Sequence, residues 1–368
     1  MPSMSNGQSS DFQFLEMTNF QISVSPYFTS WLEEQKVSLV FTNTLGNRLF
    51  FIGLKPDGSL SVSETRYDRC MGLKIFDSNT LYVVTRYQIW RLENALPPGQ
   101  TTEDGFDRLY IPKTAYTTGS LNIHDVDLDR DGNIIFVNTR FACLAAASEL
   151  DNFIPFWKPP FIKDLQPGDP CHLNGLAMKD GRPAFVTCFS RTQTQEGWRD
   201  EKLEGGSILD VASNEVILSG LCMPHSPTFH DGNLWITHSG TGHFGRVDLG
   251  KGSFEPLAFA PGFLRGLDFS GEFAVVGSSK PRHSNFFSGL PLEENIKQHG
   301  AVLHRGLFVF DLRSGDLAHW LSLEGVEGEI YDVVVLPGVR RARAIGFETE
   351  EIQQMVTIGP YGRLFPEQ

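Results

Sequence analysis

Several features are scarce in this chain of 368 residues, and each scarcity excludes a class of protein. No stretch approaches the roughly 18 consecutive apolar residues of a membrane-spanning helix, so the sequence predicts no membrane span. Basic residues are few: 31 Lys and Arg stand against 44 Asp and Glu, which gives a net charge of −13. Nucleic acids and anionic membranes both bind basic surfaces, so we expect neither as a partner.

Cysteine is scarce as well, with five residues and no spacing typical of a disulfide framework. An odd number of scattered cysteines in a long chain predicts reduced thiols, mostly buried. Residues 1–13 are polar and lack the apolar segment of a secretory signal. We therefore expect a flexible tail there and a cytoplasmic protein.

Glycine and proline, in contrast, are plentiful, with 36 and 21 residues spread along the chain. Hydrophobic residues make up 40% of the sequence, which is enough for a sizeable core. Short strand-like runs alternate with turn signals such as Pro56-Asp57-Gly58 and Asp231-Gly232-Asn233. This pattern predicts an all-β protein.

A short motif recurs along the chain, in which a polar or long side chain precedes a small or polar residue and a strand-like run. Its copies are Met71-Gly72-Leu73, His124-Asp125-Val126, Asn174-Gly175-Leu176, His225-Ser226-Pro227, Arg265-Gly266-Leu267 and Tyr331-Asp332-Val333. Their second residues lie 53, 50, 51, 40 and 66 positions apart. Six strand-rich units of this size predict a six-bladed β-propeller, formed as one domain by residues 14–368. We expect insertions near residues 149–170, 192–205 and 280–304.

The last unit is too short to form a complete blade. After the strand over residues 333–336, little strand-like sequence remains, whereas three such runs stand unassigned between residues 37 and 62. We expect these N-terminal strands to pair with the last one, because closing the ring removes exposed sheet edges.

The repeat predicts which side chains face the central channel, since the first strand of each blade lines it and residues i and i+2 share a side. One ring would contain Met71, His124, Asn174, His225, Arg265 and Tyr331. A second ring, two residues earlier, would contain Arg69, Asn122, His172, Met223, Phe263 and Glu329. Blades 2, 3 and 4 would then direct three histidines towards one point.

Three converging imidazoles with an open position are typical of a catalytic metal site. We therefore predict one transition-metal ion held by His124, His172 and His225, with iron or copper favoured and zinc possible. The alternative is a polar channel of hydrogen-bonded histidines and ordered water, which fits the same spacing.

Other polar residues near the channel are candidates for catalysis and substrate binding. Glu329 and Tyr331 are candidate proton carriers, and His238, at the end of a second strand, is a candidate acid or base. Candidates for binding an anionic substrate group are Arg86, Arg140, Arg191, Arg265 and Asn174. The alternative for the arginines is pairing with Asp125, Asp332 and Glu329.

Two stretches resemble the inner-strand motifs of the gluconolactonase/regucalcin propellers, which are six-bladed metal hydrolases. They are Asn174-Gly175-Leu176-Ala177 and Met223-Pro224-His225-Ser226-Pro227. The resemblance implies a divalent ion bound through Asn174 and through the position of His225, where that family has Asp. Imidazole in place of the carboxylate favours a transition metal over calcium and departs from the lactonase pattern.

A second resemblance covers nearly the whole chain. The stretches Tyr67-Asp68-Arg69-Cys70-Met71-Gly72-Leu73, Thr85-Arg86-Tyr87-Gln88-Ile89-Trp90-Arg91 and Gly197-Trp198-Arg199-Asp200 are similar to a bacterial family of conserved hypothetical proteins with a predicted β-propeller fold. This resemblance implies the fold and no activity.

Three functions stay open. The first is a metal-dependent enzyme that oxidises or oxygenates a small molecule or a peptide side chain. The second is a metal-dependent hydrolase or lyase, in which a metal-bound water reacts and Glu329 or Tyr331 carries the proton. The third is a non-catalytic binding module, in which the aromatic segment 153–161 docks a protein or a peptide. Whether this segment is a lid or a docking surface stays open. The substrate and the oligomeric state stay open.

Overall fold

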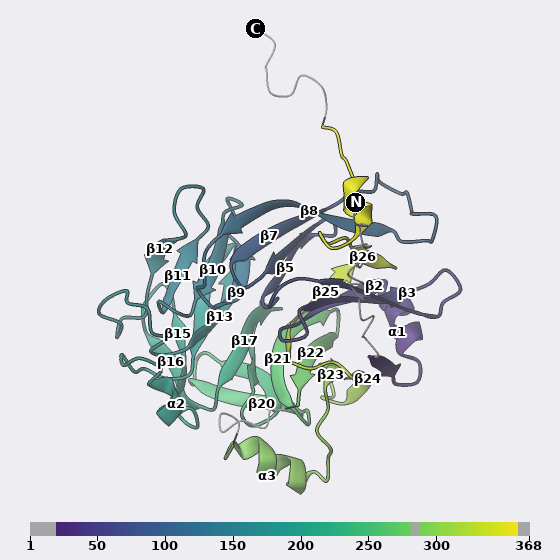
Figure 1. The fold of residues 1–368 in the computed structure, drawn as a ribbon. Helices are drawn as coiled ribbons and strands as arrows, with labels where there is room; N and C mark the ends of the chain where they lie inside the picture. The colour runs from purple at the N-terminus through teal and green to yellow at the C-terminus, as the bar shows by residue number, and fades with distance from the viewer. Residues whose placement is uncertain (1–19, 281–287, 360–368) are drawn as a thin grey trace, which may run out of the picture.

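The computed structural model describes residues 20–280 and 288–359. Its strands form six sheets arranged as a ring, with β5, β9, β13, β17, β21 and β25 around the centre (Figure 1). The fold is the predicted six-bladed β-propeller. The predicted tail over residues 1–13 lies outside the described residues.

Blades 1 to 3 each contain four consecutive strands, running outward from the channel. Blade 1 contains β5 (Leu73–Asp77), β6 (Thr80–Val84), β7 (Gln88–Asn94) and β8 (Arg108–Thr117). Blade 2 contains β9 (Ile123–Leu128), β10 (Ile134–Asn138), β11 (Cys143–Ala146) and β12 (Ile154–Trp157). Blade 3 contains β13 (Leu173–Lys179), β14 (Arg182–Cys188), β15 (Gly206–Asp210) and β16 (Val216–Leu221).

Blades 4 and 5 follow the same order, and blade 6 combines the two ends of the chain. Blade 4 contains β17 (Pro224–His230), β18 (Asn233–His238), β19 (His243–Asp248) and β20 (Ser253–Phe259). Blade 5 contains β21 (Phe263–Ser270), β22 (Phe273–Ser279), β23 (Gly306–Asp311) and β24 (Leu317–Glu324). Blade 6 contains β25 (Ile330–Pro337), β2 (Val37–Asn43), β3 (Arg48–Leu54) and β4 (Leu60–Arg66).

The predicted ring closure is confirmed. β2 pairs antiparallel with β25, and Val40 lies opposite Val334. The core at this junction joins blades, since Phe41 of β2 stacks on Phe50 at a centroid distance of 4.9 Å and shares a buried cluster with Val275 and Val309 of blade 5. Strands β2 and β3 are buried along their whole length because neighbouring blades cover both faces.

Two further strands at the chain ends were not predicted. β1 (Gln21–Val24) pairs antiparallel with β24 at the outer edge of blade 5, and β26 (Ala342–Ala344) pairs in parallel with β8 at the outer edge of blade 1. The N-terminal segment thus reaches blade 5 and the C-terminal segment reaches blade 1, so chain ends secure both neighbours of blade 6.

Helices occupy connections outside the sheets. α1 (Phe28–Gln35) follows β1 and buries Trp31 and Leu32. α2 (Trp198–Glu201) lies in the expected insertion 192–205, and α3 (Pro291–Gln298) lies in the insertion near 280–304. A short 3₁₀ helix, η1 (Glu350–Gln353), follows β26.

The aromatic segment 153–161 contains β12, the outermost strand of blade 2, and its Trp157 indole donates to Asn214 Oδ1 at 2.8 Å. This strand lies at the rim of the ring. Within the described ranges, no helix is both long and apolar enough to cross a bilayer. All five cysteines are buried free thiols, as predicted.

Candidate active site in the central channel

The inner strands begin with a shared backbone conformation. Arg69, Asn122, His172 and Met223, which the repeat aligns, all have φ between 46° and 54°. This left-handed conformation costs a non-glycine residue about 1 kcal/mol or more, so its recurrence indicates a structural requirement at this position. Each turn leads into the inner strand, and the recurrence supports the predicted alignment of blades 1 to 4.

The channel contains two cavities, an upper one at the starts of the inner strands and a lower one along their middle parts. The upper cavity, of about 560 Å³, is lined by Arg69, His172 and Arg265, among others. The lower cavity, of about 170 Å³, is lined by Asn174 and His225, among others. His124 and Tyr331 line both, so these two side chains form part of the partition.

His172 is fixed on three sides in the upper cavity. Its Nδ1 lies 2.7 Å from Asp169 Oδ2, and the Phe189 and Trp198 rings lie 4.4 Å from its centroid. A carboxylate only accepts, so Nδ1 carries the proton and the neutral imidazole has its lone pair on Nε2.

His124 lies beside His172, with 4.6 Å between the ring centroids. Its Nδ1 lies 2.7 Å from the Asn122 carbonyl oxygen and 2.8 Å from Thr139 Oγ1, so Nε2 again holds the lone pair. Burial and the neighbouring His172 lower the pKa of His124 well below its ordinary value. At neutral pH it is therefore a neutral base.

His225 faces the lower cavity and has a different partner. Its Nδ1 lies 2.9 Å from Ser239 Oγ and 3.0 Å from the Met223 carbonyl oxygen, and its Nε2 accepts from Arg265 Nε at 3.2 Å. Burial and the Arg265 charge lower the pKa of His225 well below its ordinary value.

Arg265 of β21 reaches Glu329, which immediately precedes β25 on the neighbouring blade. The two side chains form a buried ion pair, and the Phe263 and Tyr331 rings each lie 5.0 Å from the guanidinium carbon. Glu329 thus reaches into the channel, as predicted, and binds Arg265 there. The Tyr331 hydroxyl has no hydrogen-bond partner among residues 20–280 and 288–359, and burial raises the pKa of Tyr331 well above its ordinary value.

The predicted three-histidine site does not assemble in this arrangement. His124 and His172 lie together, but His225 lines only the lower cavity and binds the Arg265 cation. In the described part of the chain, no group of three or more His, Cys, Asp or Glu side chains is arranged to hold a metal ion. The expected ligand set therefore does not fit one ion, and the transition metal stays a prediction.

The remaining predicted residues lie in different places. Arg86 lines the upper cavity and pairs with Asp68 at 3.1 Å. Arg140 donates to the Ser120 carbonyl oxygen at 2.9 Å, and it lines neither channel cavity. Arg191 is exposed and also lines neither cavity. Of the predicted arginine pairings with channel carboxylates, that of Arg265 with Glu329 forms.

Two other candidates have structural contacts. Asn174 lines the lower cavity, where its Oδ1 accepts from Thr187 Oγ1 at 2.8 Å. His238 lines neither cavity, and its Nε2 accepts from the Cys222 backbone N–H at 2.6 Å. Burial lowers the pKa of His238 to about 4, so it is a neutral hydrogen-bond acceptor for the connection between β16 and β17.

Asp169 and Trp198 are important site residues that the sequence reasoning missed. Asp169 had a detectable signal, because it stands three residues before His172 between Gly168 and Pro170, where a turn returns the carboxylate to the ring. Trp198 had no such signal in the sequence, because it reaches the cavity only through the position of α2 in the folded protein. Arg69 was placed in the upper ring but not recognised as a binding residue; its Nη2 donates to Asn122 Oδ1 at 3.3 Å.

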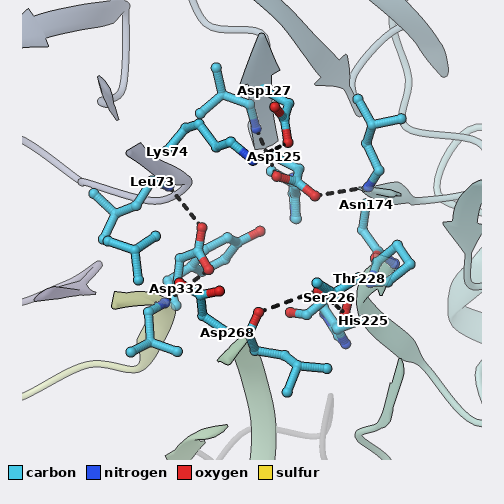
Figure 2. A pocket seen from close by; sticks show the side chains of 18 of the residues that line it. Leu73, Lys74, Asp125, Asp127, Asn174, His225, Ser226, Thr228, Asp268 and Asp332 are labelled. Atoms are coloured by element: carbon cyan, nitrogen blue, oxygen red, sulfur yellow. Dashed lines mark hydrogen bonds and ion pairs between the residues drawn. The ribbon is translucent and has the colours of Figure 1, made fainter. Parts of the chain in front are cut away.

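A second pattern connects the blades within the channel. Polar residues and glycines alternate at the second motif position: Gly72, Asp125, Gly175, Ser226, Gly266 and Asp332. Each polar member accepts a backbone N–H from the next blade at 2.8 Å: Asp125 from Leu176, Ser226 from Gly266, and Asp332 from Leu73. Figure 2 shows the link between Asp332 and Leu73. At this motif position, a side chain thus links every second blade junction.

The glycines at the alternate positions permit close packing. A Cβ at Gly175 would lie 2.2 Å from Pro227 Cδ, and one at Gly266 would lie 2.6 Å from the Val333 backbone nitrogen. Gly266 also has a φ of 77°, which disfavours other residues. Around the ring, this motif position therefore alternates between a side chain that binds the next blade and a glycine that permits close packing, and Asp268 adds a hydrogen bond to Val335 at the junction of blades 5 and 6.

Comparison with known proteins places the chain in a family. The family described as "Domain of unknown function (DUF4915)" matches residues 26–345, which include every blade and the candidate site. The chain belongs to the DUF4915 family. This agrees with the resemblance to conserved hypothetical propeller proteins and adds no activity. Comparison of this DUF4915 chain with the curated proteins gives no match.

Solved structures similar to this DUF4915 protein share its fold at low sequence identity. A chain of a nidogen/laminin complex is 11% identical, with a TM-score of 0.50, over 82% of this chain and 99% of that one. A putative gluconolactonase is 12% identical, with a TM-score of 0.44, over 72% and 80%. Virginiamycin B lyase from Staphylococcus aureus is 13% identical, with a TM-score of 0.38, over 70% and 96%. Such similarities show at most the fold.

Proposed function

We propose that this DUF4915 protein is an enzyme that binds a small anionic molecule in the upper cavity and moves a proton by general acid–base catalysis, in a lyase or hydrolase reaction. The observation that carries the proposal is the Asp169–His172 pair, which faces a cavity that also contains buried Arg265. His172 would be the base and His124 a second proton carrier.

Histidine paired with a carboxylate is suited to taking up a proton. Asp169 orients the ring and fixes the Nδ1–H tautomer, while Phe189 and Trp198 restrict its rotation. His124, neutral and 4.6 Å away between centroids, lies in position to accept or return a proton on the same molecule. General acid–base catalysis of this kind typically contributes about 10²–10⁴-fold to a rate.

Two arginines support an anionic substrate. In the described part of the chain, Arg69 has no carboxylate partner, although it lines the cavity. Arg265 uses Nε for His225 and Nη1 for Glu329, and its Nη2 has no acceptor among the described residues. Guanidinium N–H groups with unused donors bind carboxylates and phosphates through paired hydrogen bonds.

The experiment uses solvent deuterium, so that the product does not have to be known. The protein is incubated in D₂O with a panel of small mono- and dicarboxylates and phosphate monoesters, and proton NMR follows loss of carbon-bound protons and new products. Thermal shift measures binding in parallel. We expect one class of anion to stabilise the protein and to react.

Matched variants assign the roles. His172→Gln should retain anion binding and lose at least about 100-fold in exchange or turnover. Arg69→Gln should weaken anion binding, whereas Arg130→Gln, which changes an exposed arginine in a blade 2 hairpin, should not. Wild-type turnover by His172→Gln would reject the assigned base, and anion binding with no reaction in any panel would favour the binding module.

The second candidate is the metal-dependent enzyme. It is favoured by the way in which Nδ1 of His124 and of His172 is held, since metal-binding histidines commonly have the other ring nitrogen fixed by a carbonyl or a carboxylate. A bound iron or copper ion would supply the oxidation chemistry expected from the sequence, and zinc would supply a Lewis acid. Elemental analysis of untagged protein tests it: a stoichiometric transition metal that His172→Ala loses would support this candidate.

A further inference from the structure

The lower cavity contains an unusual concentration of carboxyl groups. Asp125 and Asp127 of β9, Asp268 of β21 and Asp332 of β25 all line it, and Lys74 of β5 is the one basic side chain among its lining residues (Figure 2). Lys74 Nζ lies 2.5 Å from Asp127 Oδ2. Four carboxylates thus stand against one ammonium group.

Backbone hydrogen bonds hold these carboxylates in place. Asp332 accepts from the N–H groups of Leu73 and Val333, and Asp268 accepts from those of Phe269 and Val335, at 2.7 to 2.9 Å. A fixed carboxylate cannot turn away from its neighbours, so their repulsion persists unless a proton or a cation offsets it. The cavity is therefore prearranged for positive charge.

A buried polar group provides an independent indication of a ligand. Tyr331 is 7% exposed and lines the lower cavity, and its hydroxyl has no hydrogen-bond partner among the described residues. An unsatisfied buried hydroxyl costs about 1–3 kcal/mol, and a ligand N–H group would satisfy its oxygen.

The shape and lining of the cavity favour an organic cation over a metal ion. The carboxylates come from three blades, and the described residues contain no group of three arranged to hold a metal. Carboxylates separated in this way suit a polyatomic cation with several N–H donors. Leu176, Leu267 and Val334 add apolar walls that suit an alkyl chain.

We propose that the lower cavity binds a primary alkylammonium group, from a free amine or from a lysine side chain, through Asp125, Asp268, Asp332 and the Tyr331 hydroxyl. Lys74 already shows the type of group that the cavity accommodates, since its ammonium binds Asp127. The alkyl part of the ligand lies against the apolar walls. This site is separate from the anion site proposed for the upper cavity.

Isothermal titration calorimetry on the intact protein tests the proposal. The probes are butylammonium and 1,4-diaminobutane as free amines, Nα-acetyl-lysine amide as a lysine side chain, tetramethylammonium as a cation without N–H donors, and calcium. We expect saturable binding of a primary ammonium probe and at least 10-fold weaker binding of tetramethylammonium. Comparison of the free amines with the lysine probe identifies the source of the ammonium group.

The equivalent motif position of blade 4, where Ser226 stands, suggests the variant for Asp332. Asp332→Ser removes the carboxylate but leaves a hydroxyl able to accept the Leu73 N–H, as Ser226 accepts that of Gly266. We expect Asp332→Ser to weaken ammonium binding at least 10-fold, Asp231→Ser at an exposed hairpin to leave it unchanged, and Lys74→Met to strengthen it by freeing Asp127. Asp125→Ser, at the same motif position, is the second variant if Asp332→Ser does not fold.

His172→Gln distinguishes this proposal from the proposed function. It changes the upper cavity alone and should retain ammonium binding, so failure of either site leaves the other testable. Absence of saturable binding by every primary ammonium probe would overturn the proposal. So would wild-type affinity in folded Asp332→Ser, or binding of calcium alone.

Discussion

At the scale of single residues, the pairing of His172 with Asp169 is the contact on which the proposed chemistry depends. Asp169 itself has a φ of 47°, so the turn that presents its carboxylate is strained and is held by the surrounding structure. Among residues 20–280 and 288–359, Asp169 is the carboxylate that contacts His172 Nδ1.

Replacing Asp169 by Asn should preserve the size of the side chain and remove its charge. We expect proton exchange or turnover of the upper-cavity substrate to fall by about 10²–10⁴-fold, because the amide neither stabilises the imidazolium nor enforces the Nδ1–H tautomer. Nitrogen-15 NMR of the histidines measures the tautomer directly. Unchanged turnover with a changed tautomer would show that the pair is structural.

Arg265 allows a second test at this scale, because its ion pair with Glu329 is buried, with the residues 7% and 3% exposed. Arg265→Met should cost about 3–5 kcal/mol in the free energy of unfolding, since it leaves the Glu329 charge in the channel without its guanidinium. Arg265→Met/Glu329→Gln should recover most of this loss. Urea unfolding measures both, and equal losses in the two variants would contradict the ion-pair explanation.

Sequence periodicity identified the residues of the channel but not their grouping. The sequence repeat alone was enough to predict that four residues line the channel: His124, His172, Arg265 and Tyr331. The sequence prediction directed His172 and His225 towards one point, although it placed His172 in the ring two residues earlier, and two strand residues span about 6.6 Å. The pairing of Arg265 with His225 and Glu329 of the two neighbouring blades depends on its rotamer, which no spacing encodes.

At the scale of elements, the links between blades are single side chains that bind backbone groups of the next blade. The sequence showed these positions as small or polar residues. It did not show which backbone group of the next blade each of them contacts, so the reason for their alternation was not predictable. β26 was not predicted, since three residues carry no periodicity and their partner is a strand more than 220 positions earlier.

The Asp332 link between blades 6 and 1 gives a prediction that contrasts two substitutions. Asp332→Ala should cost about 1–3 kcal/mol, because the Leu73 N–H loses its acceptor within the channel, and Asp332→Ser should cost less. Urea unfolding at pH 6 measures the difference. Equal stability of the two variants would show that the link contributes nothing.

The same link should depend on pH. Burial and the Asp125 carboxylate raise the pKa of Asp332 well above its ordinary value, so the folded state binds a proton that the unfolded state releases. The stabilising contribution of this proton is present at acidic pH and is lost as pH rises towards and through the folded pKa. Wild type should therefore lose stability relative to Asp332→Ser between pH 5 and pH 8, by at most ~1.4 kcal/mol per pH unit.

The lowered pKa values of His124 and His225 act in the opposite direction at lower pH, because the unfolded histidines bind protons below about pH 6.5. Comparison with the Ser variant cancels this contribution. A constant stability difference between wild type and Asp332→Ser across this range would show that Asp332 is ionised throughout.

At the scale of the whole molecule, closure of the ring could be predicted by counting. Six motif copies and a last unit without enough strands left the N-terminal runs as the available partners, and the pairing of β2 with β25 confirmed this. The added pairing of β1 with blade 5 and of β26 with blade 1 spreads the closure over three blades. We therefore expect the ring to unfold as one unit despite its repeat architecture.

Phe41→Ala tests this expectation. Phe41 is fully buried, stacks on Phe50 and packs with residues of blade 5, so we expect a loss of about 3–5 kcal/mol from a cavity at the closure. Phe76→Ala, at a 64% exposed position, should change little. If the ring is cooperative, tryptophan fluorescence and circular dichroism should shift together in Phe41→Ala to one lower midpoint. Separate midpoints would mean that blades 5 and 6 unfold before the channel site does. Blades 2 to 4 alone would then keep the candidate site rigid.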